Sequence, residues 1–414
     1  MYVSRKQSVI VTGVTLSGNL GGLAMFEALK EICTESEINV LLASILPNED
    51  KKSKSAKRTV VLDLNYKFFL MILAPLCLIM YLLPVSIAVK KKLLGLNDAL
   101  KEYSTATAVY DLSGICFVDG RGGALLWYNI AILLPALAMD IPVYKLSQAV
   151  GPFNKLMNRF FAKLMLSRCA HIFARGEISY SYLKELRLSN ISKSPDISFT
   201  LNSNVLLSKA RNIVPKEKFI AICPSRVVEA YCESSNINLI EILVQYIVYL
   251  LGMNYSVVLL PHSEDSGIKK NNDMAVCKKV LNRINKDLVK SGTKENVIIV
   301  SAEGSAKLAR EIIGLSEFAI VSRFHSMIAA LSKSTPCLTI GWNHKYQEAA
   351  MPFGLEKLVV GYENLDFETL KVKTEYLLSH YNDYKNLMLI AATTESDSAR
   401  RSINETIERI TSNA

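Results

Sequence analysis

The sequence lacks the residue clusters that hold metal ions or carry dithiol chemistry. Its eight cysteines lie far apart, and none forms the close pairs that zinc sites and redox motifs require. The five histidines likewise show no ligand spacing with aspartate or glutamate. We therefore expect no catalytic metal and no cofactor, and we interpret the cysteines as small buried side chains.

Signatures of nucleic-acid binding are also missing, because the basic residues are scattered and accompany no helix-turn-helix, zinc-finger or RNA-binding aromatic motif. The formal net charge of +10 still favours an anionic partner, such as acidic lipid or a phosphorylated small molecule. Residues 1–6 lead directly into an apolar run and leave no room for a secretory signal. We therefore expect a reducing, cytoplasmic location.

Apolar, β-rich runs alternate with helix-length amphipathic segments along the chain, in two series. Such runs are typical of buried parallel strands. The pattern predicts an α/β fold with two Rossmann-like, doubly wound domains facing a cleft. We place the domains at residues 1–200 and 201–380, followed by a helical segment at 381–414, with the boundary in the polar stretch 192–218. The expected strands are residues 9–11, 40–45, 115–118, 142–146, 171–174, 219–223, 257–260, 297–300, 318–321 and 336–340.

An apolar insertion at residues 68–92 departs from this plan. It is uncharged up to its final lysines and is preceded by Lys67. About 20 apolar residues can cross a bilayer as a helix, but one crossing would separate strands of a single sheet, and Pro75 and Pro84 interrupt the helix. We expect peripheral contact with the inner face of a membrane. Apolar helices packed on the sheet or on a partner subunit are the alternative, and a true span is the least favoured.

Two glycine-rich loops follow runs of the first series, at residues 12–22 and 119–123. Glycine lets the backbone approach a ligand closely, although a tight turn without a ligand is the alternative. The spacing does not match the dinucleotide fingerprint G-x-G-x-x-G, so we expect no nicotinamide cofactor. The candidate substrate-binding residues in these loops are Gly18, Asn19, Gly21, Gly22, Gly122 and Gly123.

Polar residues follow the apolar runs of the second series, at the edge of the sheet where ligands of such folds bind. An arginine and a histidine stand directly before a helix after the run 318–321, an arrangement that forms an anion site. His344 stays an open candidate. The residues concerned are Ser225, Arg226, His262, Arg323, His325 and Ser326.

Several of these segments, taken in order, resemble the polysaccharide pyruvyl transferase family over most of the chain. The most specific are the Arg-x-His motif, the strand after it and the Gly-Pro-Phe segment. The insertion, and Leu23 where many relatives place an acid, depart from the family pattern. The resembling segments are residues 18–22, 148–153, 173–177, 195–199, 260–262, 322–326 and 335–343.

The resemblance implies a fold like that of two-Rossmann-domain (B-type) glycosyltransferases and a phosphoenolpyruvate donor. Its pyruvyl group would be placed as a ketal on a sugar of a cell-surface glycan or its lipid-linked precursor. Arg323 would then hold phosphate or carboxylate, and Arg226 would be a second clamp. His325 would be an acid or base, and His262 would accept a proton or neutralise phosphate.

Two other functions remain open from the residues. The same two-domain shape would suit a nucleotide-sugar glycosyltransferase that uses its arginines on a diphosphate. A non-catalytic, membrane-associated scaffold would explain the insertion and the positive charge, but not the paired arginine and histidine.

Overall fold

The computed structural model describes residues 7–57, 59–264, 271–287 and 296–412, so the predicted absence of a leader at residues 1–6 concerns residues outside this description. The chain divides into two compact units. Unit 1 comprises Met1–Ser17, Met25–Thr200 and Asp397–Ala414, and unit 2 comprises Gly18–Ala24 and Leu201–Ser396. The short segment Gly18–Ala24 thus groups with the second half of the chain, far from it in sequence.

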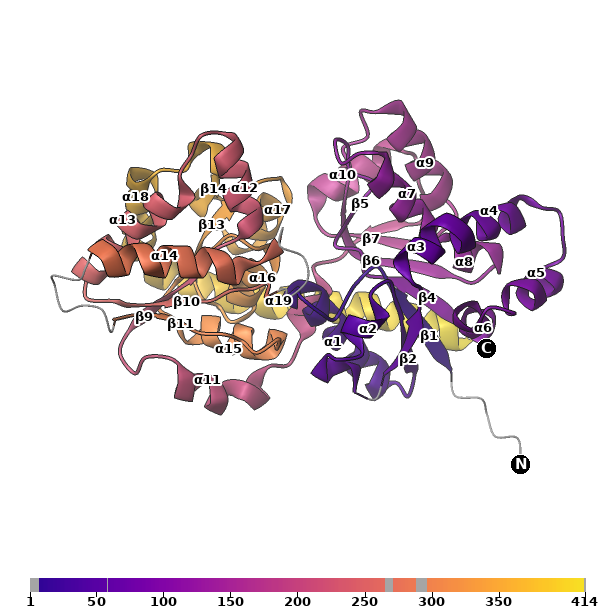
Figure 1. Ribbon diagram of the computed structural model, residues 1–414, viewed down its shortest axis with the longest axis horizontal. Helices are drawn as coiled ribbons and strands as arrows, with labels where there is room; N and C mark the ends of the chain where they lie inside the picture. Colours follow the sequence, from indigo (N-terminus) through magenta and orange to yellow (C-terminus); the bar gives the residue numbers. More distant parts are fainter. Residues whose placement is uncertain (1–6, 58, 265–270, 288–295, 413–414) are drawn as a thin grey trace. The chain divides into compact units, whose positions relative to one another are not determined.

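Unit 1 contains a parallel sheet with helices on both of its faces (Figure 1). The strand order is β3-β2-β1-β4-β6-β7-β8, and the short β5 pairs with β6. The order reverses between β1 and β4, which is the pattern of a doubly wound fold. The strands are β1 Ser8–Thr12, β2 Asn39–Ser44, β3 Val60–Asp63, β4 Ala108–Asp111, β5 Ile115–Cys116, β6 Val143–Val150, β7 His171–Ala174 and β8 Ile191–Lys193.

Unit 2 repeats this plan with the strand order β11-β10-β9-β12-β13-β14, again parallel and reversing once, between β9 and β12. The strands are β9 Phe219–Cys223, β10 Ser256–Leu259, β11 Val297–Ile299, β12 Ala319–Val321, β13 Cys337–Gly341 and β14 Val359–Gly361.

Helices connect the strands in both units. In the first half they are α1 Leu20–Glu35, α2 Pro47–Asp50, α6 Asp98–Thr105, α7 Gly123–Ala131, α8 Leu134–Ala138, α9 Leu156–Leu166 and α10 Glu177–Glu185. In the second half they are α11 Leu207–Ile213, α12 Arg226–Ser234, α13 Leu239–Gly252, α14 Asp273–Asp287, α15 Ala306–Leu315, α16 Phe324–Ser332, α17 Lys345–Ala350, α18 Phe367–Ser379 and α19 Tyr381–Ser412.

The strands follow the predicted apolar runs because helices cover both faces of each sheet. All residues of β9, β12 and β13 are buried, as parallel strands covered on both faces must be. The prediction of a strand at residues 115–118 is wrong in its extent, since β5 ends at Cys116 and Phe117 adopts a left-handed backbone with φ 47°. The strand β4, which pairs with β1 on the side opposite β2, was not predicted.

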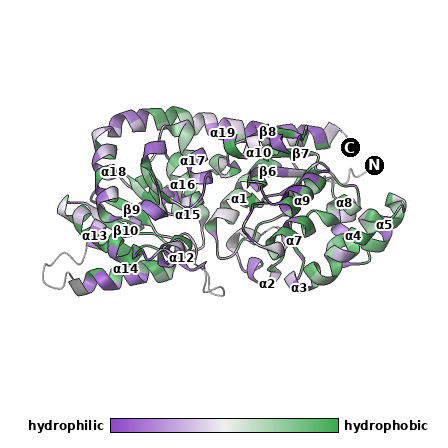
Figure 2. Cartoon of the chain, turned by 90° about the horizontal axis from the view of Figure 1, so that it is seen from above, coloured by the Kyte–Doolittle hydropathy of each residue, from purple (hydrophilic) through white to green (hydrophobic). Residues whose placement is uncertain are grey.

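The apolar insertion forms three short helices, α3 Tyr66–Phe68, α4 Ala74–Leu82 and α5 Ile87–Leu94, with a π-helical stretch, η2 Phe69–Leu73, joining α3 to α4. One side of α4 packs against α8 and buries Cys77 and Met80. Hydrophobic residues run along α4 (Figure 2), and its other side is exposed at Ile79 and Leu82. The segment is therefore both packed on unit 1 and open to its surroundings.

No single helix in the described part of the chain is long and apolar enough to cross a membrane. The bent pair formed by α12 and α13 meets that test by length and composition alone, and one face of α13 is buried, at Leu243, Ile247 and Leu250 among others.

Candidate active site

The predicted residues of the second half gather at the carboxyl edge of the unit 2 sheet. Ligands of doubly wound sheets bind at this edge, where the strand order reverses. Ser225 and Arg226 follow β9, and Arg323 follows β12, the strand next to it. His262 follows β10, on the other side of β9.

The first glycine loop belongs to this edge, because the segment Gly18–Ala24 packs within unit 2. Asn19 forms an antiparallel bridge with Ser263, whose hydroxyl donates a hydrogen bond to the Gly18 carbonyl at 2.6 Å. The Leu20 amide donates to the carbonyl of His262 at 3.2 Å. Two predicted groups, the glycine loop and the histidine after β10, are thus joined through the backbone.

Gly21 lies against the imidazole of His325. A Cβ atom at Gly21 would stand 2.1 Å from Nδ1 of that ring, so any side chain at this position would force the His325 imidazole to move. The need for glycine here comes from contact with a protein side chain. His325 lies in the first turn of α16, where the helix dipole favours negative charge in a ligand.

Arg323 is held by a carboxylate that the sequence analysis missed. Its Nε donates to Oδ2 of Asp273 at 2.9 Å and its Nη2 donates to Oδ1 at 2.6 Å, while Nη2 also donates to the Asn271 side chain at 2.7 Å. The Arg226 amide donates to the same Asp273 carboxylate at 2.9 Å. The Nε–Nη2 edge of the Arg323 guanidinium is therefore occupied by a partner within the protein. Through these bonds Asp273, the first residue of α14, connects the loop after β9 with the loop after β12.

His262 is buried, and its protonation is strongly opposed. Burial, together with the nearby positive groups His325, Arg323 and Arg310, lowers its pKa to about 3. Nδ1 of its ring has no hydrogen-bond partner among the described residues. His262 is therefore a neutral imidazole at neutral pH and a proton acceptor in this state of the site.

The guanidinium of Arg226 pairs with carboxylates of its own helix, at 3.0 Å from Glu229 and 3.2 Å from Glu233. Ser225 caps α12, and its hydroxyl accepts a hydrogen bond from the Val227 amide at 3.2 Å. Both predicted residues therefore have structural partners already, and only the partly exposed side of the Arg226 guanidinium faces outward.

The remaining candidates of unit 2 lie on the adjoining loops. The Ser326 hydroxyl donates to the Arg323 carbonyl at 2.7 Å and so stabilises the turn before α16. His344 precedes α17 and lies 3.8 Å from Glu348, and burial lowers the pKa of this histidine. Lys345, not predicted, lies over the Trp342 ring at 4.8 Å from its centroid.

The second glycine loop lies in unit 1. Gly122 and Gly123 are exposed, and a Cβ atom at either would meet no atom within 4 Å. Gly122 has φ +81°, so backbone conformation is what requires glycine there. The Asp119 carboxylate fixes the loop by accepting hydrogen bonds from the Asn154 and Lys155 amides at 2.6 and 3.0 Å.

The carboxyl edge of the unit 1 sheet carries a buried charge network that was not predicted. Asp111 at the end of β4 pairs with Lys145 on β6, and both side chains are fully buried. Burial disfavours the charged form of each side chain, but the attraction and hydrogen bond between the two charges outweigh the effect of burial. The pKa of Asp111 is therefore lowered and that of Lys145 is raised. A second buried pair joins Arg175 to Asp196 at 3.0 Å.

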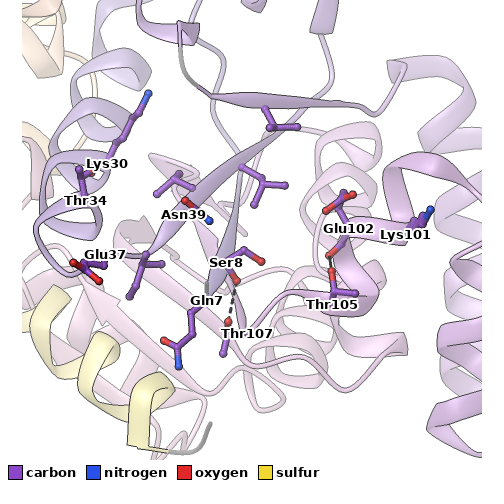
Figure 3. Close-up of a pocket in the computed structure, with 14 residues that line it drawn as sticks. Gln7, Ser8, Lys30, Thr34, Glu37, Asn39, Lys101, Glu102, Thr105 and Thr107 are labelled. Carbon is purple, nitrogen blue, oxygen red and sulfur yellow. Dashed lines mark hydrogen bonds between the residues drawn. The ribbon is translucent and has the colours of Figure 1, made fainter. Parts of the chain in front are cut away.

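A large hollow in unit 1, about 960 Å³, lies at the opposite edge of its sheet. Figure 3 shows Ser8 and Asn39 at the amino ends of β1 and β2, with Lys30 and Lys101 on the surrounding helices. None of the predicted residues lines this hollow. Because doubly wound sheets bind ligands at their carboxyl ends, we keep the candidate site at the other edge.

Within the described parts of the chain, no group of three or more His, Cys, Asp or Glu side chains is placed to hold a metal ion.

Comparison with known proteins identifies the family. The model of the polysaccharide pyruvyl transferase family matches residues 19–344, which include all the predicted site residues except Gly18. The chain belongs to this family. Membership confirms the predicted resemblance and makes the protein a polysaccharide pyruvyl transferase, a transferase that acts on polysaccharide.

One relative of this polysaccharide pyruvyl transferase is the amylovoran biosynthesis protein AmsJ of Erwinia amylovora. The two chains are 22% identical over 308 residues, which cover 72% of this chain and 71% of AmsJ.

Solved structures of similar shape confirm the predicted fold class. A UDP-GlcNAc 2-epimerase from Methanocaldococcus jannaschii aligns with a TM-score of 0.59 and 12% identity, covering 97% of this chain and 99% of that one. A glycosyltransferase from Rickettsia africae aligns with a TM-score of 0.57 and 14% identity, covering 99% and 100%. At these identities the likeness concerns the fold alone: two Rossmann-like domains of the B-type glycosyltransferase kind.

Proposed function

We propose that this transferase moves the pyruvyl group of phosphoenolpyruvate onto a sugar as a ketal. The observation that carries the proposal is the gathering of Arg323, His325 and His262 against the Gly18–Ala24 segment at the carboxyl edge of unit 2. Phosphoenolpyruvate carries a carboxylate and a phosphate, so its site needs cations as well as groups that give and take protons.

The reaction needs a proton on the methylene carbon of the donor and attack by a sugar hydroxyl on its central carbon. The bond from that carbon to the phosphate oxygen then breaks, and a second hydroxyl of the same sugar completes the ketal. Of the two hydroxyl protons released, one balances the new methyl group and the other leaves with phosphate. The site must therefore contain at least one acid and one base.

His325 is our candidate for the proton on carbon, and His262 for accepting the hydroxyl proton. His262 is neutral because burial and its positive neighbours lower its pKa to about 3. A bound dianionic donor would offset those neighbours and favour the protonated form. Proton acceptance by His262 would then follow donor binding.

Arg323 would bind the donor through the guanidinium edge that Asp273 leaves open. Its Nε and Nη2 atoms are engaged by Asp273, whereas Nη1 has no partner among the described residues. Arg226, Ser225, Ser326 and His344 stand around the same edge and remain proposed donor contacts. Gly122 and Gly123 of unit 1 remain proposed acceptor contacts.

We place the enzyme at the cytoplasmic face of a membrane, with a lipid-linked glycan as acceptor. The insertion supports this location, because Met71 and Leu82 are exposed to 76% and 70%. Lys92 on α5 of the same insertion is exposed as well, although Lys90 is buried and reaches the Tyr81 carbonyl. Apolar side chains next to exposed lysine suit the surface of an anionic leaflet.

The test is to incubate the purified protein with phosphoenolpyruvate and candidate lipid-linked or soluble glycans while following phosphate release. Glycan-dependent release of phosphate, with a pyruvate ketal on the product, is expected. A parallel reaction with nucleotide sugars addresses the glycosyltransferase alternative. Release of nucleoside diphosphate there, with no phosphate release from phosphoenolpyruvate, would overturn the proposal.

A further inference from the structure

Helix α9 carries a stripe of exposed apolar side chains on unit 1. Leu156 is 82% exposed, Met157 63% and Phe160 61%, and Leu164 continues the stripe one turn further. The other side of α9 is buried in unit 1 through Ala162 and Met165. A helix that is already packed on one side does not need these four large side chains for the core of its own unit.

The charged residues of the segment 155–166, which contains α9, are all basic. Lys155, Arg159 and Lys163 are exposed and alternate with the apolar residues along α9. No aspartate or glutamate occurs in residues 141–176, in residues 120–139 or in residues 64–97. The Asp119 carboxylate beside the start of α9 is engaged by the Asn154 and Lys155 amides. An apolar stripe flanked by basic side chains is complementary to an anionic lipid leaflet.

The stripe is linked to the apolar insertion through α7. Helix α7 packs against α9, and the indole of Trp127 on α7 donates a hydrogen bond to the Leu70 carbonyl of η2 at 3.1 Å. Figures 1 and 2 both show α7 between α9 and α3. The stripe, α7 and the insertion therefore form one side of unit 1.

The second glycine loop begins on this same side. One carboxylate oxygen of Asp119 accepts hydrogen bonds from the Asn154 and Lys155 amides just before α9, and the other accepts from the Asn158 side chain at 2.8 Å. The exposed residues 120–123 lead from this anchor directly into α7. A group bound by the loop would thus lie beside α9.

We propose that α9 is a second lipid-contacting helix, which together with the insertion seats unit 1 on an anionic membrane surface with residues 119–123 at the lipid boundary. A lipid-linked substrate would then reach the loop without leaving the membrane. This docking surface, made of α9 and the insertion, is inferred from the exposures, charges and contacts of these helices. Only the identification of the lipid-linked substrate as the glycan acceptor rests on the proposed function.

The experiment is flotation of the full-length protein with vesicles of phosphatidylcholine alone or mixed with phosphatidylglycerol. The wild type should bind the anionic vesicles more tightly. Because each basic residue near an anionic surface contributes about 1 kcal/mol, replacing Arg159 and Lys163 by serine should weaken binding roughly 25-fold. The apolar variant Leu156→Ser, Met157→Ser, Phe160→Ser should weaken binding at least as much.

The matched control is Leu389→Ser with Ile390→Ser on α19, whose side chains are 57% and 70% exposed and whose segment, residues 381–396, contains one basic residue, Lys385, against three in residues 155–166. This control should bind anionic vesicles like the wild type. Unchanged vesicle binding by both α9 variants would overturn the proposal. So would a wild-type dimer that the α9 variants convert to monomers without loss of vesicle binding, since α9 would then be a subunit interface.

Thermal unfolding and phosphate release with a soluble glycan fragment should be unchanged in the α9 variants. These readouts separate the two proposals. If the wild type binds anionic vesicles through α9 but releases no phosphate from phosphoenolpyruvate, the proposed function fails and the docking surface stands.

Discussion

Charged residues occur at the carboxyl ends of β4 in unit 1 and β12 in unit 2, the strands at which each strand order reverses. The two sets of charges differ in how much of their side chains is exposed. In unit 1, Asp111 at the end of β4 and Lys145 on β6 are fully buried and form an ion pair. In unit 2, the Arg323 side chain keeps 14% of its surface exposed while Asp273 holds one of its edges. The comparison suggests that the unit 1 pair fixes loops, whereas the unit 2 pair positions a group that can still reach a ligand.

The sharpest way to break this comparison is Lys145→Met, which leaves Asp111 buried without its partner. We expect the free energy of unfolding to fall by about 3–5 kcal/mol, the usual cost of an uncompensated buried charge. Urea denaturation measures this change. Lys193→Met is the control, because Lys193 forms an exposed pair with Glu177 and its loss should cost little. Equally small decreases in the free energy of unfolding of both variants would contradict a structural role for the buried Asp111–Lys145 pair.

The next largest effect should come from His325→Ala in unit 2. Turnover should fall by about two to four orders of magnitude, as is usual on removing a general acid or base. Steady-state kinetics and calorimetry with phosphoenolpyruvate separate chemistry from binding. His380→Ala, at the end of α18, should leave turnover unchanged. A His325 variant that binds no donor would show that this histidine is a ligand and not primarily a proton donor.

Arg323→Lys tests whether the open edge of the guanidinium matters beyond its charge. Lysine keeps the positive charge near Asp273. It cannot donate two parallel hydrogen bonds to the Asp273 carboxylate and also contact the donor substrate. Loss of one charged hydrogen bond, about 1.5–3 kcal/mol, predicts roughly a 10-fold to 100-fold fall in kcat/KM. Arg226→Lys should cost less, because Arg226 pairs with Glu229 and Glu233 of its own helix. A larger loss in the Arg226 variant would reverse these roles.

Most of the buried strands could be predicted from the sequence because both faces of each sheet are covered, although β4, whose residues are all buried, was missed. The strand β9 is a continuous apolar run for this reason. Two edge strands of unit 1 lack this pattern: β3 is exposed at Val60 and Asp63, and β8 reads Ile-Ser-Lys, so neither was predicted. The strand β14 is only three residues long and was missed as well.

The site was predictable where a strand end carries its own polar residue, as at Arg323 and His325. Asp273 was not, because it reaches Arg323 from a helix start 50 positions away and has no local signal. Lys145 did leave a signal, since a lysine within an apolar run indicates a buried partner. The packing of Gly21 on His325 joins residues 304 positions apart, which no local pattern can indicate.

The smallest effect that we predict is a pH dependence of the free energy of unfolding, caused by His262 of unit 2. His262 has a pKa of about 3 in the fold, against an ordinary value of 6.5, because of burial and its positive neighbours. Below pH 6.5 the unfolded chain therefore binds a proton that the folded chain does not, so His262 makes stability fall as pH falls from 6.5 towards 3. Between pH 7 and pH 5 this amounts to about 2 kcal/mol.

His262→Gln removes this titration, so its free energy of unfolding should fall less than that of the wild type over the same pH interval. Denaturation at pH 7 and pH 5 measures the difference in slope, which is independent of any constant loss caused by the substitution. His171→Gln in unit 1 is the comparison, since His171 is only half-buried and hydrogen-bonded to Ser192. If wild type and His262→Gln lose stability equally on acidification, the imidazole is not held neutral, and its role as proton acceptor in unit 2 fails with it.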